Sequence, residues 1–214
     1  PNHQWQADLV DLSALKTYND GYTFLLTVID VFSKVAWCIP LRNKSAAQLK
    51  VAFQTLLQQH SIKVLQTDKG TEFLNKEVQV LLKKHNVHFF TTHNEETKAS
   101  VVERFNRTLK TKMWKYFTQK GTRRYIDILP DLMNSYNHSY HRSIKMAPME
   151  VNEKKQEIVW QHLYGKSIPY KPPKLNKGDS VRISKAKKQF KKGYLPNWSD
   201  EIFHIHHVQQ QSNP

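Results

Sequence analysis

The sequence predicts an α/β domain built on a mixed five-stranded sheet flanked by helices, followed by a basic linker and part of a small β module. Three apolar, β-branched segments come first, and helix and strand patterns then alternate before the helices take over. This order of elements is typical of a layered α/β domain with a mixed sheet. With 214 residues, 39% of them hydrophobic, the chain can fill one such core and a small second module.

Five segments have the composition of strands. The second is rich in β-branched and aromatic residues and follows the turn signal Asn19-Asp20-Gly21. The expected strands are Trp5–Leu12, Tyr22–Asp30, Val35–Ile39, Ile62–Gln66 and Val87–Thr91.

Four segments have helical periodicity. From Ser45 to His60 the apolar residues recur at three- and four-residue steps, which predicts an amphipathic helix with Ser45 as its N-cap. The other expected helices are Asn75–His85, a long helix whose apolar positions run from Val102 to Phe117, and Tyr125–His138.

Composition and periodicity along the chain predict a core over residues 1–160, a Pro/Lys-rich linker over 161–177 and a β module over 178–214. Residues 165–177 hold three prolines and four lysines with little periodicity, which is typical of a semi-rigid linker. GDSVRIS then opens a strand, but about forty residues are too few to close a stable barrel. We therefore expect a truncated module. Because Pro1 stands first, we expect a processed product or a fragment of a longer protein.

The charge distribution predicts a polyanionic partner. The formal net charge is +15, and the excess is densest over residues 103–124 and 155–192. Two separate basic tracts favour nucleic acid over an ordinary solvated surface. A membrane partner is disfavoured, because no apolar stretch approaches the ~20 residues of a membrane span and the second tract is rich in proline. The single cysteine, Cys38, excludes an internal disulfide and a Cys-rich zinc site.

Three acidic residues stand out by their places in this pattern. Asp8 lies within the first strand, where an unpaired carboxylate is costly, and Asp68 ends a buried strand, where α/β sheets tend to place ligand-binding groups. Glu103 opens the long basic helix. Structural roles are equally open for each: a salt bridge for Asp8, a turn or N-cap for Asp68, and a first-turn acid for Glu103.

The long helix should present a polar face beside Glu103. At about 100° per residue from Glu103, Asn106 falls at about −60°, Lys110 at about −20° and Arg107 at about +40°. A carboxylate that holds a hard cation, flanked by cations that hold phosphate, suits phosphoryl transfer. The opposite side of the helix carries the apolar residues Phe105, Leu109 and Met113, near about 200°, 240° and 280°.

Three sequence blocks resemble the signature of a known family. WQAD around Asp8, QTDKGTEF around Asp68 and KASVVERFNRTLK around Glu103 look like the blocks of the DDE integrase core of retroviruses, LTR retrotransposons and related DNA transposons. DVFSK, YNHSYHRS and APMEV extend the resemblance. The tail from Gly178 is similar to the SH3-like C-terminal module of integrases from Maverick/Polinton self-synthesising transposons. The resemblance implies an RNase H-like core.

The resemblance also implies an activity. Asp8, Asp68 and Glu103 would be the catalytic and metal-binding residues, holding two Mg²⁺ or Mn²⁺ ions about 4 Å apart. The implied enzyme is a polynucleotidyl transferase with endonuclease activity, which processes the 3′ ends of element DNA and joins them to target DNA by in-line phosphoryl transfer. Double-stranded DNA and further copies of the chain, as a homodimer or higher homo-oligomer, would be its partners. A nuclear location is implied as well.

DNA contacts are implied at two places. Asn106, Arg107 and Lys110 match family positions that contact the donor DNA end. A second set would bind the DNA backbone non-specifically and with a steep salt dependence. It comprises Lys185, Lys187, Lys188, Lys191 and Lys192.

Two features depart from the family pattern. Thirty-four residues separate Asp68 from Glu103, where the family usually has thirty-five. The zinc-binding module that precedes many integrase cores has no counterpart, because one cysteine and scattered histidines lack the ligand spacing. We therefore interpret His138 and His141 as structural or phosphate-facing residues.

Several alternatives stay open from the sequence. Glu72 lies near Asp68 and is a rival metal ligand, whereas Asp11 should point away from Asp8 because their separation along the strand is odd. Asp30 is expected to brace the core. Trp5, Trp37 and Trp114 are interpreted as core or interface aromatics. A hydrolytic nuclease with the same carboxylates, or a host-adopted and catalytically silent DNA-binding protein, would also fit.

Overall fold

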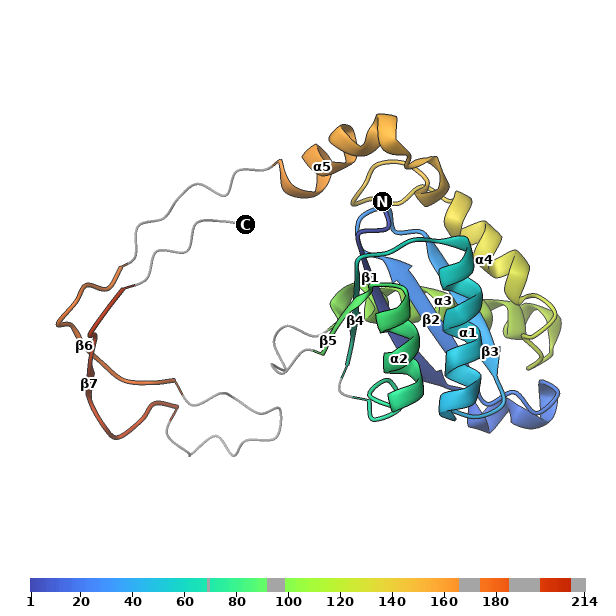
Figure 1. Cartoon of the computed structure of the whole chain (residues 1–214), viewed down its shortest axis with the longest axis horizontal. Helices are drawn as coiled ribbons and strands as arrows, with labels where there is room; N and C mark the ends of the chain where they lie inside the picture. The colour runs from blue at the N-terminus through green and yellow to red at the C-terminus, as the bar shows by residue number, and fades with distance from the viewer. Residues whose placement is uncertain (69, 92–98, 166–173, 185–196, 209–214) are drawn as a thin grey trace. The chain divides into compact units, whose positions relative to one another are not determined.

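The structure is a computed structural model, which describes residues 1–68, 70–91, 99–165, 174–184 and 197–208. The chain divides into two compact units, Pro1–Lys166 and Ser167–Pro214 (Figure 1). Within the described ranges, none of the helices combines the length and the apolar character that crossing a bilayer requires.

The first unit is built on a mixed five-stranded sheet in the order β3-β2-β1-β4-β5. β1 pairs antiparallel with β2 and parallel with β4; β2–β3 is antiparallel and β4–β5 parallel. The predicted α/β class with a mixed sheet is thus confirmed. The strands are β1 Gln4–Asp11, β2 Phe24–Asp30, β3 Ala36–Leu41, β4 Val64–Thr67 and β5 His88–Thr91.

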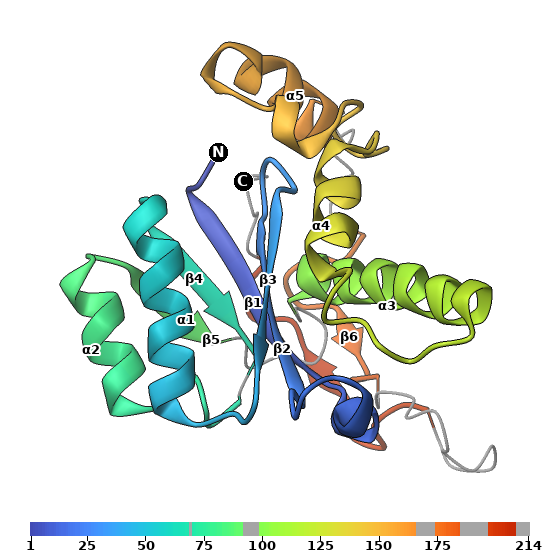
Figure 2. The ribbon, with the colours of Figure 1, turned by 90° about the vertical axis from the view of Figure 1, so that its right-hand side faces the viewer.

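Helices cover both faces of this sheet. Figure 2 shows α1 and α2 on one side and α3 and α4 on the other. Each side has its own hydrophobic core: Phe53 and Leu82 belong to the α1/α2 side, and Leu109 and Met133 to the α3/α4 side. The helices are α1 Ala46–Gln59, α2 Lys76–Lys84, α3 Ser100–Lys120, α4 Leu129–His138 and α5 Gln156–Tyr164.

The alternation of side chains along β1 decides which residues meet which helices. Trp5 and Ala7 pack in the α1/α2 core, whereas Val10 packs in the α3/α4 core. Successive side chains of a strand point to opposite faces. Asp8 therefore shares the face of Val10 and is directed towards α3.

Some expectations about the helices need correction. The helix predicted from Tyr125 begins only at Leu129, with Pro130 in its first turn. Proline suits this position because it has no amide hydrogen to donate and its φ is already helical. Ser45 occupies the N-cap position of α1, but its side chain makes no capping hydrogen bond. The 3₁₀ helix η1 (Ser13–Tyr18) and helix α5 were not among the predicted elements.

A fully buried amide, that of Asn19, joins η1 to the loop between α3 and α4. Its Nδ2 donates to the carbonyl oxygens of Leu15 (2.8 Å) and Arg123 (3.1 Å). Its Oδ1 accepts from the backbone N–H groups of Tyr125 (2.7 Å) and Ile126 (3.2 Å). One side chain thus satisfies four backbone groups of two segments about 100 residues apart in sequence, and so ties the α3–α4 connection to η1.

The second unit contains little described secondary structure. β6 (Ser180–Val181) pairs antiparallel with β7 (Phe203–His204), and an isolated bridge joins Ser184 to Trp198. The predicted strand at GDSVRIS coincides with β6. The SH3-like character of the module stays a prediction, as do the domain boundaries at 160 and 177. The predicted DNA-binding lysines Lys185, Lys187, Lys188, Lys191 and Lys192 lie outside the described residues.

Replacing Asn19 should destabilise the first unit. Asn19→Ala leaves buried backbone donors and acceptors without partners, so we expect the free energy of unfolding to fall by about 2–4 kcal/mol. Urea unfolding followed by circular dichroism measures this loss. Asn134→Ala, at an exposed position on α4, is the matched control and should cost much less. Equal losses in the two variants would show that the Asn19 network contributes little.

Candidate active site

Asp8 lies in the central strand of the sheet with both carboxylate oxygens engaged. The backbone N–H of Leu9 donates to its Oδ1 (2.8 Å), and Nδ2 of Asn106 on α3 donates to its Oδ2 (2.7 Å). The neighbouring Thr27 on β2 donates its hydroxyl to the Asp8 carbonyl (3.2 Å). The carboxylate is therefore fixed in orientation on the α3 side of the sheet.

The pKa of Asp8 is raised above its usual value. Burial is the largest cause, and the negative charges of Asp68 and Glu103 raise it further. The hydrogen bonds from Leu9 and Asn106 act in the opposite direction without cancelling this shift. The structure thus places Asp68 and Glu103, from two other segments of the chain, within electrostatic reach of Asp8.

Because its pKa is raised, ionisation of Asp8 lowers the stability of the fold. The folded chain holds the Asp8 proton more tightly than the unfolded chain does. Asp8 therefore costs stability as the pH rises from the unfolded pKa through the raised folded pKa, and the full cost is present above the latter. A cation bound beside Asp8 would offset this cost.

Asp68 follows β4 at the start of an exposed turn. Its Oδ1 accepts a hydrogen bond from the backbone N–H of Gly70 (3.2 Å), so the turn-forming role left open by the sequence is present. A Cβ placed on Gly70 would lie 3.2 Å from Oδ1 of Asp68 and 3.1 Å from Oε2 of Glu72. Two carboxylates thus border the space beside Gly70, and the rivalry between Asp68 and Glu72 persists in the fold.

Glu103 lies exposed in the first turn of α3, and Gln6 of β1 holds that turn against the sheet. Oε1 of Gln6 accepts from the backbone N–H groups of Val101 and Val102, both at 3.0 Å. Nε2 of Gln6 donates in turn to Gln66 on β4 (2.9 Å). Gln6 therefore caps α3 from a distance in sequence, and the sequence pattern gave no sign of it because a capping residue is sought just before its helix.

Asn106 differs from its expected place on the polar face. It is only 7% exposed, and its Oδ1 has no hydrogen-bond partner. The helical angles carried a signal for this, because about −60° lies only about 20° from Met113 on the buried face. Its amide binds Asp8 in this structure, so a contact of Asn106 with DNA stays a prediction. Arg107 and Lys110 are exposed on the same helix, as expected.

Two of the rival carboxylates have other roles. Asp11 is exposed at the end of β1, where it accepts from the backbone N–H of Ser13 (2.8 Å), and its pKa is lowered, chiefly by the side chain and backbone of Ser13. Asp30 is fully buried and accepts from the backbone N–H of Ser33 (3.0 Å) and from its hydroxyl. The expectations that Asp11 points away from Asp8 and that Asp30 braces the core are confirmed.

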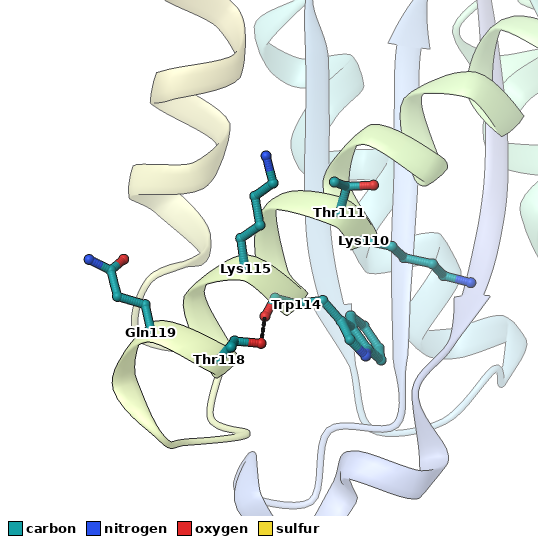
Figure 3. Close-up of a pocket in the computed structure, with 6 residues that line it drawn as sticks. All are labelled: Lys110, Thr111, Trp114, Lys115, Thr118 and Gln119. Atoms are coloured by element: carbon teal, nitrogen blue, oxygen red, sulfur yellow. Dashed lines mark hydrogen bonds between the residues drawn. The ribbon is translucent and has the colours of Figure 1, made fainter.

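The three tryptophans have different environments. Trp5 is fully buried and packs against Trp37, with ring centroids 4.6 Å apart. Trp114 is 49% exposed, so it is not a core residue, and its role at an interface stays a prediction. Figure 3 shows Trp114 and Lys110 on the same side of α3, in a shallow pocket along the helix.

The donor set around Asp8 suits a hard divalent cation. Carboxylate oxygens and an amide oxygen are ligands that Mg²⁺ and Mn²⁺ accept, and the unpartnered Oδ1 of Asn106 lies beside Asp8. In the part of the chain that the structure describes, however, no three acidic, histidine or cysteine side chains are close enough to hold a metal ion together. A shared cation would therefore have to draw Asp68 and Glu103 closer to Asp8.

Part of the chain is similar to integrases and transposon-derived proteins. Residues 1–95, which include Asp8 and Asp68 but not Glu103, match the integrase core domain family. A transposon-derived protein of Caenorhabditis elegans is 35% identical over 196 residues, which cover 90% of this chain and 65% of that protein. The family match thus covers less than half of this chain, and the chain spans 65% of the length of that relative. Ty1 Gag-Pol polyproteins of Saccharomyces cerevisiae are 29% identical over 98 residues, covering 42% of this chain and 6% of the polyprotein.

Solved integrase structures share the fold. The catalytic core of HTLV-2 integrase in complex with magnesium has a TM-score of 0.59 at 19% identity, covering 71% of this chain and 96% of that core. The BIV integrase core has a TM-score of 0.59 at 20% identity and covers 75% of this chain and 100% of its own length. A chain of the simian T-cell lymphotropic virus intasome has a TM-score of 0.64 at 17% identity, and the match covers 94% of this chain and 68% of that one. The RNase H-like fold is thereby confirmed.

Removing the Gln6 cap should loosen the helix that carries Glu103. Gln6→Ala leaves the Val101 and Val102 amides without their acceptor, so we expect unfolding to become easier by roughly 1–2 kcal/mol. Hydrogen exchange of these two amides should also accelerate. Gln4→Ala is the control, because Gln4 bonds Gln66 but has no bond to α3. Unchanged exchange at Val101 and Val102 would contradict the capping role.

Proposed function

We propose that this protein is a transposon or retroelement integrase, a metal-dependent polynucleotidyl transferase that processes DNA 3′ ends and joins them to target DNA. The observation that carries the proposal is the placement of Asp8: Leu9 and Asn106 hold its two oxygens, and Asp68 and Glu103 lie near enough for their charges to oppose its ionisation. A strand that places a carboxylate under such repulsion gains nothing from it in stability. The arrangement is understandable where a divalent cation completes the site.

Asp8, Asp68 and Glu103 would hold the metal ions. When bound, Mg²⁺ or Mn²⁺ ions supply charge neutralisation at the phosphate under attack and activate the attacking oxygen, which is water for end processing and a DNA 3′-hydroxyl for joining. The chain's own contribution is positional. Leu9 and Asn106 hold both oxygens of Asp8, and Gln6 holds the first turn of α3, which carries Glu103.

Arg107 and Lys110 would hold the DNA end beside the carboxylates. Both are exposed and follow Glu103 on α3 by one and two turns. Guanidinium and ammonium groups bind phosphate oxygens by charge-assisted hydrogen bonds, which position a strand without reading its sequence. The lysines from Lys185 to Lys192 would add backbone contacts to the same duplex.

Assembly and location are part of the proposal. The HTLV-2 core has been solved in trimeric and dimeric forms, and another related chain belongs to an intasome. We therefore infer that this chain acts as a homo-oligomer on double-stranded DNA, in the nucleus. A kinship with Maverick/Polinton elements would follow from the tail, whose module begins at Gly178.

Replacing Asp68 should separate catalysis from binding. Asp68→Asn keeps the side-chain shape and the turn to Gly70, yet we expect joining of element ends to fall by at least about 100-fold, since even outer-shell partners of metals cost ~10–100-fold. DNA affinity should be retained, because phosphate contacts elsewhere dominate it. The measurement is a strand-joining assay in Mg²⁺ or Mn²⁺ with terminal DNA of the element, beside a filter-binding assay.

Glu72→Gln is the matched control, because it removes one neighbouring negative charge in the same turn. It should keep most of the joining activity, and the reverse ranking would assign the metal to Glu72. Metal-dependent cutting without joining would indicate a hydrolytic nuclease. Binding with neither reaction in the wild-type chain would contradict the proposal and indicate a catalytically silent DNA-binding protein.

A further inference from the structure

A polar cavity lies on the α3/α4 side of the sheet, and none of the three carboxylates lines it. It has a volume of about 630 Å³ and is bordered by the first turns of α3, the end of α4 with the loop that follows it, and the turn between β2 and β3. We call it the α3–α4 cavity; its cations are Lys34, Arg104, Lys112 and Arg142.

The cavity wall has four cations and no carboxylate. Ser100 and Ser143 also line it and can add neutral donors to the charged ones, whereas the hydroxyl groups of Thr108 and Ser139 already donate to the carbonyl oxygens of Arg104 and Ser135. Among the described residues, the ion pairs within 4.0 Å join other side chains, and none of them involves these four cations. Among the residues that the structure describes, no carboxylate in direct contact therefore neutralises the positive charge of the wall.

Lys34 is an unusual member of this wall because it is only 8% exposed. Its Nζ donates to the carbonyl oxygen of Val31, and its backbone has a left-handed φ of 66°, which is uncommon outside glycine. Burial lowers its pKa most; the Asp30 carboxylate raises it and Arg104 lowers it. That carboxylate already accepts two hydrogen bonds from Ser33. Burying a cation in this way is costly unless an anion or further acceptors reach it.

His141 gives an independent sign of a missing partner. Its ring Nδ1 is buried and has no hydrogen-bond partner, although most buried polar atoms have one. Burial, Lys34 and then Arg104 lower its pKa, so the ring is held neutral beside two cations. His141 lines the cavity, and with the proton on Nδ1 its neutral ring has a hydrogen-bond donor without an acceptor among the described residues.

We propose that the α3–α4 cavity binds a phosphate group, supplied by the backbone of a DNA strand that passes outside the catalytic centre. Two guanidinium forks, two ammonium groups, hydroxyls and an unpartnered imidazole nitrogen match the oxygens of a phosphodiester. The choice of DNA as the source rests on the proposed function. A soluble phosphorylated compound would use the same chemistry, so the test has one arm for each source.

The first arm measures DNA affinity of the full chain in EDTA, with a labelled duplex at several salt concentrations. Arg104→Ala/Arg142→Ala removes two exposed cations of the cavity, whereas Lys83→Ala/Lys84→Ala removes two exposed cations at the end of α2, on the other face of the sheet. We expect the cavity variant alone to lose roughly tenfold or more in affinity and to lower the salt slope by about one per lost phosphate contact.

The second arm measures the unfolding temperature with inorganic pyrophosphate. One outcome is that pyrophosphate raises the unfolding temperature of the wild type and the control but not of the cavity variant, while DNA affinity is the same in all three. That result would keep the phosphate site and assign it to a soluble compound. If the cavity variant keeps both its DNA affinity and its stabilisation by pyrophosphate, the proposal is overturned. Should the double variant unfold, Arg142→Glu alone, in the exposed loop after α4, replaces it.

This experiment is independent of catalysis because EDTA removes divalent metal. A chain that fails to join DNA but shows the cavity-dependent affinity would lose the integrase proposal and keep the phosphate site. A chain that joins DNA with no effect of Arg104 and Arg142 on either arm would lose only the phosphate site.

Discussion

The candidate active site depends on the placement of one carboxylate, Asp8, in the central strand of the sheet. Its burial and the charges of Asp68 and Glu103 work against ionisation, while a backbone amide and Asn106 hold its oxygens in place. This resistance to ionisation is electrostatic, and a bound divalent cation would offset it. The fold therefore makes ionised Asp8 unfavourable, and the proposed metal would compensate for this loss of stability.

Helix α3 is positioned by polar contacts as much as by its apolar face. Phe105, Leu109 and Met113 pack in the core beneath it, but that packing alone would tolerate small shifts along the helix axis. Gln6 and Asn106 restrict such shifts, because one caps the first turn and the other binds Asp8. The same helix carries Glu103 at the candidate active site and, about 100° further round, Arg104 at the α3–α4 cavity.

Periodicity was sufficient to predict the five strands and most helices to within a few residues, because each buries one face or stripe. It also predicted that Asp8 and Asp11 diverge, since the alternation of a strand is strict. It could not predict Gln6 or Asn19, whose partners lie about 100 residues away and depend on how layers pack. Asn106 was misplaced for a related reason: at the border of a helical face, one hydrogen bond to Asp8 outweighs solvation.

The most direct test of the account is the effect of Mg²⁺ on thermal unfolding of the wild type, of Glu103→Gln, and of Glu157→Gln as a control in the first turn of α5. At ten times its Kd, Mg²⁺ should stabilise the wild type and the control by about 1.4 kcal/mol. Glu103→Gln should be more stable than the wild type without metal, because one repulsion on Asp8 is gone, and should gain much less from Mg²⁺. An equal response of all three proteins would contradict a metal site shared by Asp8, Asp68 and Glu103.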